Sequence, residues 1–344
     1  MITVTLYFKN QSEAEIIRKD LLEIREQIPF DLVMMDITKE AVLENTYRDI
    51  APVVRAGPYQ LKGAFTKQEL WVMISSARDR DMHLQTLGDE GYRRRKKRGE
   101  TYNSGDRFTN WLTQNYMWII IGLLAVYVGL PFLAPVLMKN GKEWGANLIY
   151  KMYSVMCHQT AFRSWFLFGE QAAYPSELAH LDEYMTYEEI MGIRGARSDP
   201  ATDLNLFVLQ AREFIGNAQT GYKVALCERD IAMYGSLLLF GLIFVATGRR
   251  IPPLSWKVWI LIGILPIAID GVSQLPGFLT WIPINLPYRE STPFLRTLTG
   301  FLFGITTGWY LFPVIEETMM ETRRALVWKN ARSQQAAGEG GQAS

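Results

Sequence analysis

The chain has 344 residues, of which 49% are hydrophobic and 21% charged, and its formal net charge is +1. A charge so close to zero excludes a globally basic nucleic-acid-binding protein. The two cysteines and three histidines form no closely spaced ligand pairs. This excludes a structural zinc site built from four cysteines, or from two cysteines and two histidines.

Residues 1–80 are predicted to form a small α/β domain. Alternating polarity predicts strands at residues 3–9 and 30–37, and apolar residues spaced near 3.6 predict an amphipathic helix at 11–27. No cleavable signal precedes the first strand, so we expect this domain to stay in the cytoplasm. The other predicted elements are a helix at 39–49, a hairpin at 59–63 and a helix at 66–78.

The segments TVTLYFK, FDLVMMDIT and IAPVVRAGPYQLKG, in the order β-α-β-α-β-β-α, resemble a glutaredoxin-like thioredoxin fold. In that family a proline at the place of Pro52 follows a cis peptide bond, and a Cys-X-X-Cys pair between the first strand and helix is the redox centre. This chain has no cysteine before Cys157, and thiol exchange needs a thiolate. We therefore interpret the domain as redox-inactive, and as a scaffold or docking surface for a protein partner.

Residues 81–107 form a polar linker that contains six consecutive basic residues at 93–98. Positive residues close to a membrane helix stay on the cytoplasmic side, and they also favour anionic lipid headgroups. We interpret this run as such a topological signal, in preference to a nucleic-acid patch.

Four apolar stretches follow the linker. A spanning helix needs about 20 mostly apolar residues. Residues 108–318 are therefore predicted to form an all-α, multi-pass membrane bundle, which makes the chain a multi-domain protein. The stretches are 108–138, 231–248, 258–288, which only Asp270 interrupts, and 297–315.

Basic residues predict the orientation of these spans. Arg249 and Arg250 follow the second span, Lys257 opens the third, and further arginines follow the fourth. Because positive flanks remain inside, both termini are expected in the cytoplasm, with a tail at 319–344 whose end is disordered.

Two further segments are expected on the outer side. Residues 144–169 are mostly apolar but carry Lys151, His158 and Arg163, so we predict an interfacial helix; a fifth span is the alternative. The insert at 172–226 is predicted to be a small helical cap.

Several ordered motifs between residues 149 and 312 resemble an uncharacterised bacterial family of predicted integral membrane proteins. The resemblance implies a bacterial plasma membrane, a fold and a site, but no reaction and no cofactor. Many relatives have a Cys-X-X-Cys-like link where this chain has Cys227 and Asp230. The motifs are CHQ at 157–159, RSWFLFG at 163–169, CER at 227–229, IDG at 269–271, Gln274 and LRTLTG at 295–300.

Polar residues from these motifs are predicted to meet at the outer membrane boundary. Asp270 lies thirteen residues beyond Lys257, which places it roughly 20 Å along its span. A carboxylate at that depth needs a partner, and Arg229 or Arg296 is our first choice. The pair is either a structural ion pair or part of a functional pocket that also includes His158, Arg163 and Gln274.

Cys157 and Cys227 are candidates for a disulfide if this side is oxidising; two free buried thiols and a catalytic dithiol are the alternatives. His158 could be a general base or a metal ligand, although adjacent Cys157 and His158 point about 100° apart on a helix. Gly300, Gly304 and Gly308 share one helix face, which predicts close helix packing.

These patterns favour a non-catalytic membrane scaffold or binding protein with a polar pocket at its extracytoplasmic face. One alternative is a membrane enzyme that acts on a lipid headgroup or a quinone through His158, Asp270 and the arginines. Another is a thiol-disulfide component that uses Cys157 and Cys227.

Overall fold

A computed structural model of the chain describes residues 2–87, 101–196, 203–274 and 289–342. The chain divides into two compact units, Met1–Asn115 with Glu317–Ser344, and Tyr116–Glu316. The basic run at 93–98 and residues 275–288 of the expected third span lie outside the described residues.

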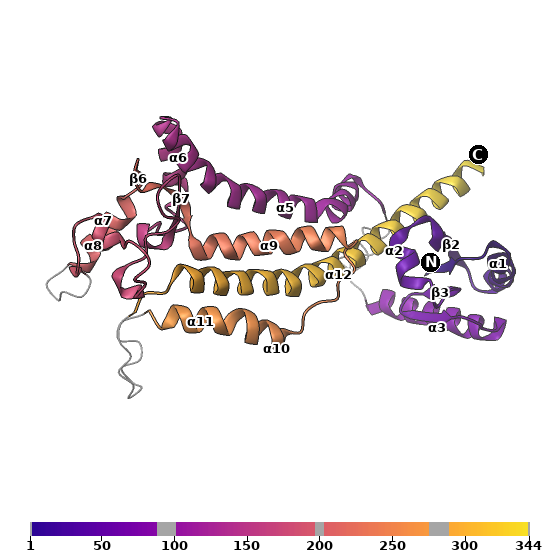
Figure 1. Cartoon of the computed structure of the whole chain (residues 1–344). Coiled ribbons are helices and arrows are strands. Elements are labelled where there is room, and N and C mark those ends of the chain that lie inside the picture. The colour runs from indigo at the N-terminus through magenta and orange to yellow at the C-terminus, as the bar shows by residue number, and fades with distance from the viewer. Residues whose placement is uncertain (1, 88–100, 197–202, 275–288, 343–344) are drawn as a thin grey trace. The chain divides into compact units, whose positions relative to one another are not determined.

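The first unit contains a four-stranded mixed sheet of order β2-β1-β3-β4 (Figure 1). Strand β1 pairs parallel with β2 and antiparallel with β3, and β3 pairs antiparallel with β4. The region is α/β, as predicted. Its elements are β1 (Ile2–Phe8), α1 (Gln11–Gln27), β2 (Phe30–Asp36), the 3-10 turn η1 (Ile37–Lys39), α2 (Ala41–Tyr47), β3 (Val53–Ala56), β4 (Tyr59–Lys62) and α3 (Lys67–Leu87).

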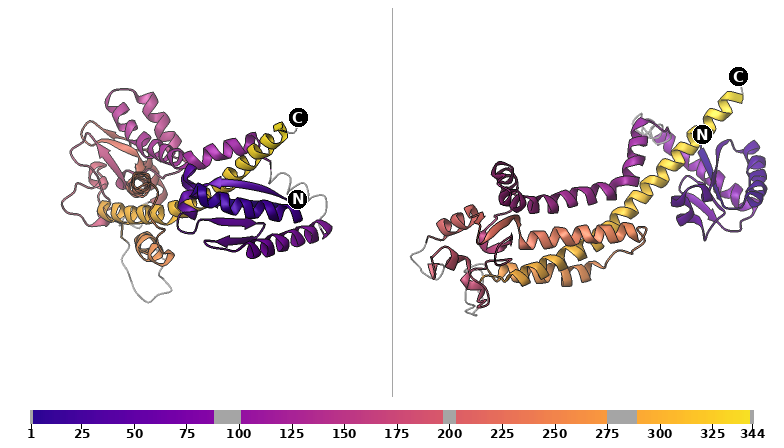
Figure 2. Two further views of the ribbon diagram at one scale, coloured as in Figure 1. Left: turned by 90° about the vertical axis from the view of Figure 1, so that its right-hand side faces the viewer. Right: turned by 45° about the horizontal axis from the view of Figure 1, so that its top comes forward.

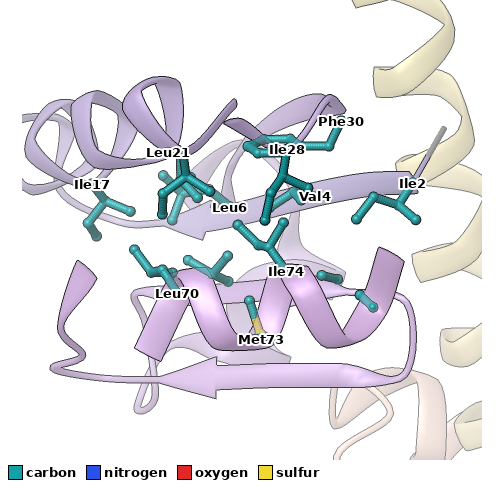
Figure 3. Packing of buried hydrophobic residues seen from close by; sticks show 14 of the residues in the cluster. Ile2, Val4, Leu6, Ile17, Leu21, Ile28, Phe30, Leu70, Met73 and Ile74 are labelled. Carbon is teal, nitrogen blue, oxygen red and sulfur yellow. The ribbon is translucent and has the colours of Figure 1, made fainter. Parts of the chain in front are cut away.

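The two faces of this sheet have different neighbours because successive side chains of a strand point to opposite sides. From β1, Val4 and Leu6 pack with residues of α1 and α3 in one apolar core (Figure 3). Tyr7 packs on the other face with residues of α2 and of the C-terminal part of α12 (Pro293–Gln342).

The C-terminal part of α12 is fixed to the sheet by side-chain contacts. Trp328 Nε1 donates to Thr5 Oγ1 at 2.9 Å, and Arg332 pairs with Asp31 at 3.2 Å. Helix α12 continues through the expected tail as far as Gln342, and the predicted disorder of the tail's end stays a prediction. The apolar side of this part of α12 covers the second face of the sheet together with α2.

In the second unit, helices alternate in direction along the chain. Helices α9 and α12 run parallel, since Gly300 approaches Arg229 and Gly308 approaches Phe240; they lie side by side in Figures 1 and 2. The elements are α5 (Ser104–Lys139), α6 (Glu143–Tyr153), η2 (Ala161–Arg163), β5 (Ser164–Leu167), η3 (Glu177–Ala179), α7 (Tyr187–Ile190), α8 (Leu204–Glu213), β6 (Gly216–Asn217), β7 (Gly221–Cys227), α9 (Glu228–Ala246), α10 (Trp256–Val258), the π-helical η5 (Trp259–Ile264) and α11 (Leu265–Val272).

Among the described residues, three helices are long and apolar enough to cross a membrane: α5, α9 and Pro293–Gln335 of α12. The predicted third span begins as the continuous run α10, η5 and α11. That run is antiparallel to α12, because Trp259 Nε1 donates to Thr307 Oγ1 while Asp270 meets Ser291.

The expectation of an all-α membrane region is wrong in one respect. Strands β5, β7 and β6 form a three-stranded sheet, and β7 occupies the end of the insert that we predicted to be helical. Aromatic and β-branched residues beside glycine turns favour this pairing over helix. The predicted interfacial helix at 144–169 is only α6, whose 11 residues are too short for a fifth span.

Candidate functional site

Asp270 is the centre of an ionic cluster where α9 and α12 begin and α11 ends. Its side chain is only 5% exposed. Ser291 Oγ donates to both carboxylate oxygens, at 2.8 and 2.9 Å. Arg229 pairs with Oδ2 and Arg289 pairs with Oδ1 at 3.0 Å. Ser291 and the two arginines thus occupy both oxygens of the carboxylate. Gln274 Nε2 donates to the backbone carbonyl of Asp270 at 2.6 Å.

Arg296 organises the second half of the cluster. It is buried, pairs with Glu290, and approaches Glu228 at 3.5 Å. Glu290 is also met by Arg163, whose Nη2 lies 2.6 Å from its Oε1. Arg296 Nη2 contacts Gln274 Oε1 at 3.4 Å, which connects this half to Asp270.

The cluster has four arginines against three carboxylates. Arg163 and Arg289 are the most accessible, each with a side chain 38% exposed, whereas the three carboxylates are almost fully buried. The exposed edge is therefore cationic. The participating residues are Arg163, Glu228, Arg229, Asp270, Arg289, Glu290 and Arg296.

The structure brings most of the predicted polar residues together. Asp270 pairs with Arg229, one of its two expected partners, while Arg296 reaches it only through Gln274. His158 is exposed, and no hydrogen bond or ion pair joins it to the cluster among the residues that the structure describes. Four members of the cluster were not predicted from the sequence, namely Glu228, Arg289, Glu290 and Ser291. The sequence did offer one signal for them: Glu228 opens the apolar helix α9, and the other three come just before the apolar helix α12.

A second group of polar side chains joins the loop after α6 to the first turn of α9. The sulfurs of Cys157 and Cys227 and a carboxylate oxygen of Asp230 all lie within 4.8 Å of one another. Both cysteines are free thiols. The Cys227 thiol donates a hydrogen bond to Cys157, which lowers the pKa of Cys157 and raises that of Cys227. The predicted disulfide stays a prediction.

Lys223 lies in β7, four residues before Cys227, and is 1% exposed. Its Nζ donates to the carbonyls of Gln159 and Arg212, at 2.8 and 2.5 Å. Burial lowers the pKa of Lys223 to about 7, because removing water penalises the charged form. Gln159 Nε2 in turn donates to the carbonyls of Tyr150 and Ala225, so hydrogen bonds join the loop after α6 to β7.

The first unit contains a cavity of about 600 Å³ beside the exposed end of the sheet. Three arginines and a group of aromatic side chains line it, together with two acidic residues. The aromatic and basic residues are Tyr7, Tyr47, Arg55, Arg80, Arg324 and Trp328.

Comparison with known proteins agrees with a membrane location. A family model described as "Predicted membrane protein (DUF2085)" matches residues 214–310, which include Cys227, Arg229, Asp270 and Arg296. An uncharacterised protein of Methanocaldococcus jannaschii is 24% identical over 211 residues, which cover 59% of this chain and 93% of that protein. No solved structure matches. Over residues 214–310 this chain is thus similar to a family of predicted membrane proteins.

Proposed function

We propose that this chain is a non-catalytic membrane scaffold or binding protein with a polar site at its extracytoplasmic face. The observation that carries the proposal is the saturation of Asp270. Both of its carboxylate oxygens accept from Ser291 and each pairs with an arginine. A carboxylate in this state connects α11 to α9 and to the segment just before α12, and it has no oxygen left to act on a substrate.

The enzyme alternative has less support. It needs His158, Asp270 and an arginine around one cavity, but His158 is exposed and Asp270 is closed in by its partners. The thiol-disulfide alternative is favoured by the closeness of Cys157 and Cys227, and remains a second candidate.

The site would bind an anionic group. Arg163 and Arg289 present the accessible edge of a cluster that has one more arginine than it has carboxylates. Guanidinium groups bind carboxylates and phosphates through paired N–H donors. A lipid phosphate at the membrane surface or a free anion would supply the same chemistry.

A four-span topology with both termini in the cytoplasm is part of the proposal. Trp328 and Arg332 at the C-terminal end contact the N-terminal sheet, so the two ends share one side of the membrane. This requires an even number of crossings. Three helices qualify by length, and the run Trp256–Val272 is about 26 Å long, so we assign the fourth crossing to it. In this topology the basic residues that flank the spans lie on the cytoplasmic side, and the membrane is a bacterial plasma membrane.

The first unit is proposed to be a glutaredoxin-like thioredoxin fold without a redox centre. Support comes from the strand order β2-β1-β3-β4 and from the cis peptide bond between Ala51 and Pro52. We propose that this unit docks a protein partner in the cytoplasm.

The anion site can be tested with the delipidated full-length protein in neutral detergent. Native mass spectrometry would compare short-chain phosphatidylglycerol, phosphatidylcholine and inorganic phosphate. We expect preference for the anionic lipid or for phosphate, and weakening by about tenfold in R163Q and in R289Q, because each removes one charge-assisted contact. The matched control is R194Q, since Arg194 pairs with Glu189 far out on the surface.

Each outcome decides something about the site. Preference for phosphatidylglycerol over phosphate identifies a lipid headgroup, and the reverse identifies a soluble anion. Equal binding of both lipids, with no effect of R163Q or R289Q, would overturn the anion site. A loss of cellular function in H158A would revive the enzyme alternative.

A further inference from the structure

We propose that Cys157, Cys227 and Asp230 bind a thiophilic divalent cation of the Zn²⁺ class. The site is separate from the arginine cluster and does not depend on the anion proposal. It uses two sulfurs and one carboxylate oxygen, which come from the loop after α6 and from the start of α9.

The distances suit such an ion. Zn–S bonds of about 2.3 Å in a tetrahedral site place two sulfurs roughly 3.8 Å apart. The three ligand atoms already lie within 4.8 Å of one another. Closing around an ion would therefore require shifts of no more than about 1 Å, which side-chain rotation can supply.

The local fold holds the ligands in place. Cys227 is the N-cap residue of α9, and Asp230 lies three residues later in its first turn, so both project from one side of the helix. The Cys157 amide donates to the Tyr153 carbonyl at 2.9 Å. The Gln159 side chain then ties this loop to Ala225 at 2.8 Å, two residues before Cys227.

Charge is the second, independent argument. Asp230 is partly buried but makes no salt bridge to any residue that the structure describes, whereas Asp270 and Glu290 each pair with two arginines. The positive end of the α9 dipole compensates only part of one charge. A bound dication would give the Asp230 carboxylate a direct cationic ligand partner. Because the two thiols each release a proton on binding, the net charge of the site would stay at −1, next to the positive end of the α9 dipole.

The coordination would leave one position open. Three protein ligands and an exchangeable fourth ligand form a recognised zinc arrangement. His158 is exposed on the adjoining loop and is not assigned to that position. Because both thiols must lose their protons on binding, the site should release protons as it loads.

The test uses full-length protein, reduced and stripped of metal in detergent, and titrated with Co²⁺ and then with Zn²⁺. We expect one Co²⁺ per chain, thiolate-to-metal charge-transfer absorption, proton release, and displacement by Zn²⁺. C157S and C227S should abolish this absorption, and D230N should weaken binding by about tenfold or more. The matched controls H158A and D182N, which alter exposed residues beside the site and in the insert, should bind as the wild type does.

The wild-type spectrum is decisive even if a cysteine variant fails to fold. Absence of thiolate charge transfer in the reduced wild-type protein would overturn the proposal. So would recovery of a Cys157–Cys227 disulfide as the resident state when cells are lysed directly into an alkylating agent. That second result would instead confirm the predicted disulfide between Cys157 and Cys227.

Discussion

Replacing Gly304 with alanine should separate two membrane helices. A Cβ built on Gly304 would lie 1.9 Å from the Met233 carbonyl oxygen and 2.2 Å from Ser236 Oγ. Both atoms belong to α9, and the carbonyl is backbone that cannot rotate away. Since ordinary carbon–oxygen contacts are well above about 3 Å, α12 must move outward by more than about 1 Å at this level.

The magnitude follows from two opposing terms. Overpacking of a close interface costs about 1–3 kcal/mol, whereas alanine in a helix is favoured over glycine by up to about 1 kcal/mol. The net loss for G304A is therefore about 1–2 kcal/mol. Gly122 of α5 provides the matched control, because no atom lies within 4 Å of its added Cβ. G122A should be neutral or slightly stabilising.

The assay is thermal unfolding of the full-length protein in one detergent, followed by the loss of the monodisperse peak in size-exclusion chromatography. For a unit of this size, a loss of about 1–2 kcal/mol lowers the Tm by roughly 2–8 °C. Equal Tm values for G304A and G122A would show that α9 and α12 do not approach closely at Gly304, and would refute the packing argument.

Two further perturbations address the polar groups. D270N should lower the free energy of unfolding by about 1–3 kcal/mol, because it leaves Arg229 and Arg289 with a neutral partner. Partial exposure of both arginines limits this cost. A Tm equal to that of the wild type in the same detergent assay would contradict this prediction. The lowered pKa of Lys223, about 7 against 10.5, means that the unfolded chain binds more protons between these values. Stability should therefore rise with pH across that window by up to a few kcal/mol and be lost as pH falls through about 7. K223M should flatten this dependence in denaturant titrations at several pH values, and an unchanged slope would count against the burial of Lys223.

The sequence predicted well where one physical requirement dominates a long segment. The apolar lengths of α5, α9 and α12 leave little choice but helix in a membrane. The alternation in residues 3–9 likewise predicted β1.

Prediction failed where structure depends on distant partners. From the sequence alone, β7 was predicted to be the end of the insert that leads into α9. It is a strand because it pairs with β5, which is distant in the sequence. The hydrogen bond from Trp328 to Thr5 likewise joins residues at opposite ends of the chain, so no local pattern in the sequence indicates it. Because a buried charge is costly, an ion pair between Asp270 and a residue near the end of a span could be expected. Arg289 and Ser291 lie 19 and 21 residues beyond Asp270 in the sequence, so no local spacing indicated that they are its partners.

The spacing of the buried charges explains why the cluster is better suited to positioning than to chemistry. Along α9, Arg229 at the cluster and Arg249 beyond the helix end are separated by about 20 residues, as are Arg296 and Glu316 along α12. Arg249 pairs with Glu316 at 3.3 Å, and Tyr116 donates to Glu316 at 2.7 Å. About twenty helical residues span about 30 Å, the thickness of a hydrocarbon core. Two polar layers thus bracket an apolar one, and each layer ties three helices at one depth. Such an arrangement avoids placing an ion at the bilayer centre, where its cost is highest, and it fixes the vertical register of the helices.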